Sequence, residues 1–166
     1  MIKAAVEPWI EAPLKRFVDD AGVMLALLLH PSGQVQAQHG FTRAVDIMSA
    51  CALAAAIHVS AGELGRQLDG KPFEGLHHAG KNRQVYMAET NTQRGPYILL
   101  TVFDEESSLG LVRLYFDEFR TNLSQAAPEL MPQPSAALAE NFEQELNTNL
   151  NALFGRTPEM KVTRDR

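Results

Sequence analysis

Histidines are the residues of this chain that most invite a metal-site interpretation. His77 and His78 are adjacent in a segment expected to be a strand, so their rings point to opposite faces. His30 and His39 flank a predicted hairpin and could approach each other, but a third ligand is not evident. We therefore predict no metal site, because solvated or core histidines explain these residues more simply.

Nucleophilic catalysis has no better support in the sequence. Cys51 lies in an apolar stretch, where a buried thiol is inert. Ser107 and Ser108 lack a surrounding G-x-S-x-G pattern, and capping of a helix explains a serine here. The acidic residues 104–106 are typical of a solvated turn. Because phosphate-binding and dinucleotide-binding glycine patterns are also missing, we expect no active site and no cofactor.

The overall composition narrows the class of protein. The 166 residues carry a net charge of −5 without a cluster of lysine or arginine, which argues against nucleic-acid binding. A single cysteine excludes an internal disulfide and fits a reducing cytoplasm. The N-terminal residues lack the apolar region of a secretory signal, and we expect no apolar run of membrane-spanning length.

Apolar patterning predicts the order helix, two strands, helix, three strands, helix. The predicted helices have apolar residues at helical spacing, and they cover residues 8–20, 47–68 and those that follow Ser108. The predicted strands are short apolar or alternating runs, at residues 23–29, 34–38, 73–78, 84–90 and 97–103.

The middle helix, residues 47–68, is apolar on all sides and is therefore expected to be buried on all sides. One stripe of large side chains suits packing on the sheet: Leu53, Ile57, Leu64 and Leu68. The roughly opposite stripe is small and predicts close contact with a partner: Ala52, Ala55, Ala56, Val59 and Gly62. We therefore expect a homodimer or a complex with another protein. The alternative is that the C-terminal tail covers this face.

The C-terminal part of the chain differs in character from the rest. Three prolines between residues 128 and 134 predict a linker at 127–135, between a domain at 5–126 and a helical tail at 136–166 with a frayed end. The tail presents an apolar edge suited to docking: Leu146, Leu150, Leu153 and Phe154. This edge either binds a partner or folds back on its own domain.

Three motifs resemble the Roadblock (dynein light chain) family: LALLLHPSGQVQAQHG, ALAAAIHVSAGELGRQL and YILLTVFDEESSLGLVRLYF. The resemblance covers roughly residues 5–123, and the strand-to-helix signature D-x-x-S-S-L-G-L-V-R is its most specific part. Within the family the chain is most similar to the bacterial MglB type, and LNALFGR resembles the end of the tail in those proteins. His58 and the many alanines of the middle helix depart from the general pattern.

The resemblance implies an α/β (α+β) sandwich, in which a five-stranded antiparallel sheet is flanked by helices. It implies a homodimer that pairs its middle helices, joins its sheets edge to edge and forms a platform for a small Ras-like GTPase of the MglA type. Such a regulator is not itself an enzyme. It stimulates GTP hydrolysis by reshaping the switch loops, without an arginine finger, and Arg113 is rejected as a finger because it lies in the terminal helix.

The implied setting is the cytoplasm of a bacterium, in cell polarity or gliding motility, with recruitment to a cell pole. Two alternatives remain open at this point. One is a Roadblock scaffold that does not affect GTP turnover. The other is a small-ligand sensor of PAS or GAF type, against which stands the apolar filling of both central strands.

Overall fold

The computed structural model describes residues 7–41, 43, 45–130, 148–149 and 155. The chain divides into two units, Met1–Glu129 and Leu130–Arg166, and every helix and strand below belongs to the first. The domain boundary at residue 126 stays a prediction; the third helix ends at Ala126 and the first unit ends at Glu129. The predicted tail-docking residues Leu146, Leu150, Leu153 and Phe154 lie outside the described residues.

A single antiparallel sheet organises the first unit, with its five strands in the order β2-β1-β5-β4-β3. This sheet confirms the predicted fold class. The strands are β1 (Leu25–Leu29), β2 (Val35–Gly40), β3 (Gly75–Ala79), β4 (Gln84–Thr92) and β5 (Gly95–Phe103). The two central strands, β1 and β5, pair with each other between Leu25↔Val102 and Leu29↔Ile98. β2 and β3 are therefore the two edges of the sheet.

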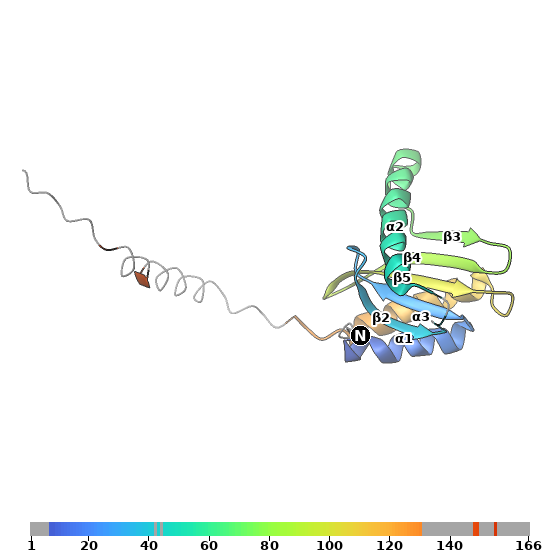
Figure 1. Cartoon of the computed structure of the whole chain (residues 1–166), viewed down its shortest axis with the longest axis horizontal. Helices are drawn as coiled ribbons and strands as arrows, with labels where there is room; N and C mark the ends of the chain where they lie inside the picture. The colour runs from blue at the N-terminus through green and yellow to red at the C-terminus, as the bar shows by residue number, and fades with distance from the viewer. Residues whose placement is uncertain (1–6, 42, 44, 131–147, 150–154, 156–166) are drawn as a thin grey trace, which may run out of the picture. The chain divides into compact units, whose positions relative to one another are not determined.

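Helices cover both faces of the sheet, as Figure 1 shows. They are α1 (Pro8–Ala21), α2 (Ile47–Asp69) and α3 (Leu109–Ala126). α1 and α3 share one hydrophobic cluster with the sheet, which includes Phe17, Phe103 and Phe119. α2 belongs to a second cluster on the opposite face.

Local sequence signals set the helix ends. Asp46 accepts a hydrogen bond from the Ser49 backbone and begins α2. Ser108 caps α3 in the same way, whereas the hydroxyl of Ser107 donates to the carbonyl of Ala21 and ties α3 to α1. Gly22 ends α1 in the left-handed conformation, at a φ of 63°. Both serines therefore have structural roles.

The hairpin between β4 and β5 is tighter than predicted. The sequence predicts a turn over residues 91–96, but the pairing continues to Thr92↔Gly95 and leaves only residues 93–94 in the turn. Gly95 has a φ of 119°, which a residue with a side chain rarely adopts. The prediction failed because Asn91 and Pro96 look like turn residues, although both are paired at this end of the ladder.

The connector from α2 to β3 folds back on the helix at Gly65. A Cβ atom at this position would lie 2.6 Å from the backbone nitrogen of Phe73 and 2.9 Å from the carbonyl oxygen of Lys71. Only a residue without a side chain permits this approach. At Gly62, by contrast, the nearest atom would be the Cβ of Pro72 at 3.9 Å, an ordinary contact.

This difference makes a matched pair of variants. Gly65→Ala should lower the free energy of unfolding by about 1–3 kcal/mol, because the connector must shift. Gly62→Ala should be neutral or stabilise by up to about 1 kcal/mol, because alanine favours the helix. Urea denaturation at one protein concentration measures both. Equal effects of the two variants would contradict the packing of the connector on Gly65.

Candidate functional site

The outer side of α2 carries exposed aliphatic side chains along most of its length. Four of them form one stripe at helical spacing, which we call the aliphatic ridge: Leu53, Ile57, Leu64 and Leu68. Leu53 is 64% exposed and Leu68 is 68% exposed. Met48 and Val59 lie on the other flank of the helix and are also exposed. Exposed aliphatic side chains gathered on one helix are typical of surfaces that bind other proteins.

This arrangement corrects the predicted orientation of α2. The ridge was expected to pack on the sheet, but it faces away from it. The buried residues of the helix are instead small: Cys51, Ala54, Ala55 and Gly65. They pack against large side chains that the sheet supplies, among them Leu27, Leu29 and Ile98. Because the strands already fill the space, only small residues let the helix lie this close.

The five small residues predicted to bind a partner have different positions in the structure. Ala55 is buried against the sheet. Ala52 meets the turn between β1 and β2, where a Cβ on Gly33 would lie 3.3 Å from the Cα of Ala52. Gly62 is half-buried, and Ala56 and Val59 are exposed. Contact with a partner at these positions stays a prediction, for which Ala52, Ala56 and Val59 have the required exposure.

A polar contact between α2 and the sheet was not predicted. The Nε2 atom of His58 lies 2.9 Å from the Oε2 atom of Glu89 on β4, and both side chains are partly buried. These residues are 31 positions apart, so their approach depends on the fold. The only signal in the sequence was a histidine among alanines, which did not identify its partner.

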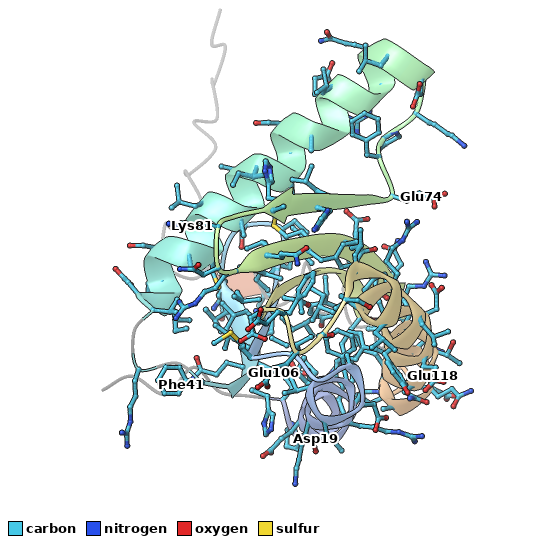
Figure 2. All side chains as sticks on the ribbon, turned by 90° about the vertical axis from the view of Figure 1, so that its right-hand side faces the viewer. Asp19, Phe41, Glu74, Lys81, Glu106 and Glu118 are labelled. Atoms are coloured by element: carbon cyan, nitrogen blue, oxygen red, sulfur yellow. The ribbon has the colours of Figure 1, made fainter. Side chains whose placement is uncertain are left out.

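β3 is a short edge strand next to the α2 surface. Figure 1 shows α2 crossing the sheet and continuing past β3, so that its C-terminal end lies beyond the edge. In Figure 2, β3 runs between the labelled residues Glu74 and Lys81, with α2 alongside. Of the five residues of β3, Leu76 is half-buried and the other four are exposed. An open edge of this kind can accept a further strand.

On the opposite face of the sheet, a groove of about 410 Å³ lies between β3 and α3. Tyr86 and Phe116 line it together with charged residues, including Glu74 and Arg113. Burial raises the pKa of Tyr86, so its phenol stays protonated at neutral pH. Arg113 is exposed here, on the face opposite to α2.

The register of the β1–β2 hairpin determines how far apart His30 and His39 lie. His39 pairs with Ala26, whereas His30 follows the far end of β1 at Leu29. The expectation that these two histidines could approach each other is therefore wrong, because the hairpin register holds them at opposite ends. Within the described ranges, His, Cys, Asp and Glu side chains form no group of three that could hold a metal ion.

α2 also corrects the prediction about apolar runs. Among the described residues it is a helix long and apolar enough to cross a membrane, judged by length and composition alone. The prediction failed because the mean hydropathy of α2 is high although it has no continuous run of large apolar side chains. Alanines between isolated polar residues contribute much of that mean. The capped start of α2 at Asp46, its small inner face and its contact with Glu89 are features of a helix packed on a protein sheet.

Comparison with known proteins identifies a family and several solved structures that this chain resembles. A family model for the Roadblock/LC7 domain matches residues 10–104. The solved structure of MglB from Myxococcus xanthus is 28% identical, with a TM-score of 0.64, and the match covers 71% of this chain and 94% of that one. A search of curated proteins gives no match.

Two further structures show the shared fold. The gliding protein MglB from Thermus thermophilus is 23% identical with a TM-score of 0.64, over 76% of this chain and 94% of that one. An MglB with a tetrameric arrangement is 22% identical with a TM-score of 0.66, over 76% of this chain and 93% of that one.

The inner face of α2 can be tested through its cysteine. Cys51 is fully buried, and burial raises the pKa of its thiol above the usual 9.0. We expect the native chain at about pH 8 to react with a thiol reagent at least tenfold more slowly than the urea-unfolded chain. Because the pKa of the thiol is higher in the folded chain, the unfolded chain releases this proton more readily than the folded chain. The free energy of unfolding should therefore fall above about pH 9. Equal reaction rates in the two states would show that the inner face is open.

Proposed function

Because this chain belongs to the Roadblock/LC7 family, we propose that it is a homodimeric regulator that stimulates GTP hydrolysis by a small Ras-like GTPase of the MglA type. The aliphatic ridge on α2 is the observation that carries the proposal. The likeness to MglB of Myxococcus xanthus, at 28% identity, supports the choice within the family.

The ridge and the β3 edge together favour a symmetric dimer. Two copies related by a two-fold axis can pair their β3 strands and, at the same time, bring their α2 helices together above the seam. Within one copy, α2 already extends past β3 (Figure 1). Fully burying one leucine contributes about 1.5–3 kcal/mol, so several leucines from each copy outweigh the ordering of exposed side chains. The same contact satisfies the free backbone groups of β3.

The other flank of α2 remains available to the GTPase after the ridge is covered. Its exposed residues are Met48, Ala52, Ala56 and Val59. In a dimer, two such flanks form a shallow platform of small and apolar side chains, onto which the switch loops of a GTPase can dock. Ala52, Ala56 and Val59 are therefore proposed as GTPase contacts, whereas Ala55 is buried against the sheet and Gly62 is half-buried.

The proposed mechanism needs no catalytic residue from this chain. Arg113, which the sequence already disfavours as an arginine finger, lies on α3, and α2 lies on the other face of the sheet. Stimulation would then come from holding the switch loops so that the GTPase's own residues align with the γ-phosphate. The chain itself has no nucleotide chemistry in this proposal, and it needs no cofactor.

The proposed setting is bacterial cell polarity and gliding motility, in the cytoplasm and at a cell pole. The description of the Thermus relative as a gliding protein supports this setting. The tail beyond the domain is proposed to contact the same GTPase at a second place, where its linker would raise the effective concentration of the docking edge.

Two charge substitutions on opposite flanks of α2 separate dimerisation from GTPase contact. Leu53→Glu places a charge in the proposed dimer contact, so the chain should become monomeric and stimulation should fall at least tenfold. Val59→Glu should leave the dimer intact and still lose stimulation. Sedimentation velocity and single-turnover GTP hydrolysis by a purified MglA-type GTPase measure the two effects.

Arginine variants serve as the control for the mechanism. Arg66→Ala and Arg43→Ala remove exposed arginines on or near α2 and should keep the rate of hydrolysis at saturating regulator. A loss of rate in either one would restore an arginine-finger mechanism. A wild-type dimer that binds the GTPase without changing its hydrolysis would favour the scaffold instead.

Truncation after Leu130 tests the tail. The cut lies beyond Ala127, a buried residue whose backbone N–H donates to the carbonyl of Leu123 at the end of α3. The shortened chain keeps this contact and should therefore fold and dimerise. We expect a modest change, about two- to tenfold, in affinity for the GTPase or in turnover, because linker ordering offsets much of the docking energy. If both quantities match those of the full chain, the tail does not contact the GTPase.

A further inference from the structure

His77 occupies the centre of the free edge strand β3, which runs from Gly75 to Ala79. Its ring is stacked on Phe103, with 6.2 Å between ring centroids and 21° between the planes. Its Nε2 atom lies 2.8 Å from the Oε1 atom of Gln84 on β4. These two contacts hold the ring on the α3 side of the sheet, although the side chain is exposed.

Symmetric pairing of β3 has a consequence for this residue. A two-fold axis joins two antiparallel copies of a strand by placing one residue opposite itself. The register that pairs all five residues of β3 is centred on His77, so Gly75 faces Ala79 and Leu76 faces His78 of the second copy. Directly opposed side chains in an antiparallel pair have Cβ atoms about 4.5–5.5 Å apart.

We propose that the two copies of His77 meet across this seam and make the dimer sensitive to pH, so that mild acidification dissociates it. The inference rests on the homodimer of the proposed function and goes beyond it by naming the residue and the signal. When both opposed rings carry a proton, they become two like charges at close range.

The charges around His77 do not cancel those two protons. The groove beside the ring holds two acidic residues and two arginines, with one acid paired to one arginine: Glu74, Asp117, Arg113 and Arg120. Near Gln84 the neighbouring charges again balance: Lys81, Arg83, Asp104 and Glu105. Tyr86, opposite His77 on β4, is neutral because burial raises its pKa. The repulsion therefore has no local carboxylate in excess to offset it.

His58 and His78 are the other histidines of α2 and β3. His58 contacts Glu89 within one copy, where it joins α2 to the sheet. His78 alternates with His77 along β3 and lies on the α2 side, where Leu76 of the second copy would oppose it. Among the histidines of α2 and β3, only His77 is therefore opposed by its own copy in this register.

The test is sedimentation of the full chain at about pH 8 and about pH 6, with circular dichroism as the control for folding. We expect a dimer at the higher pH and a roughly tenfold larger dissociation constant at the lower pH. His77→Gln should dimerise at both pH values with no such change. His77→Lys carries the charge permanently and should be weakened at both pH values.

Three outcomes would overturn the inference. A wild-type dimer of equal strength at both pH values contradicts this inference alone and leaves the proposed function standing. A pH response that persists in His77→Gln but disappears in His78→Gln or His58→Gln assigns the effect to another residue. A wild-type chain that is monomeric at both pH values contradicts the proposed homodimer as well.

Discussion

Close contact between a helix of small residues and a sheet of large ones determines how this protein is organised. Cys51, Ala54 and Ala55 bring α2 directly onto the leucines of β1 and β5, and Gly65 lets the connector return along the helix. This inner face consists of small side chains. The large ones, including Leu53 and Leu68, are left on the outside. The surface available to partners is therefore a by-product of how the sheet is covered.

Much of the fold could be predicted from local patterns. The order of elements, the caps at Asp46 and Ser108 and the end of α1 at Gly22 all depend on residues next to each other in sequence. The face of α2 that packs on the sheet could not be predicted, because a helix that is apolar on every side offers no contrast between faces. The face of α2 that packs on the sheet is determined by the volume of the strand side chains opposite the helix. Apolar periodicity within the helix gives no information about that volume.

The candidate surface shows the same division between local and long-range information. A helix rich in alanine and leucine indicated an interaction surface in need of a partner, but the proposed contact residues included Ala55, which is buried. The contact between His58 and Glu89 joins residues far apart in the chain, so no spacing rule could reveal it. The edge position of β3 likewise follows from the strand order β2-β1-β5-β4-β3, which is a property of the whole sheet.

The position of α2 in the chain also affects how the protein is made. The helix contacts β1 and β2, which precede it, and β4 and β5, which follow it. On a ribosome, α2 is therefore synthesised before part of the surface that it covers. Until residue 103 has emerged, both the inner face and the aliphatic ridge are exposed to other nascent chains and to chaperones. A surface suited to assembly thus carries a hazard during synthesis, and the small residues of the inner face limit how adhesive the unfinished chain is.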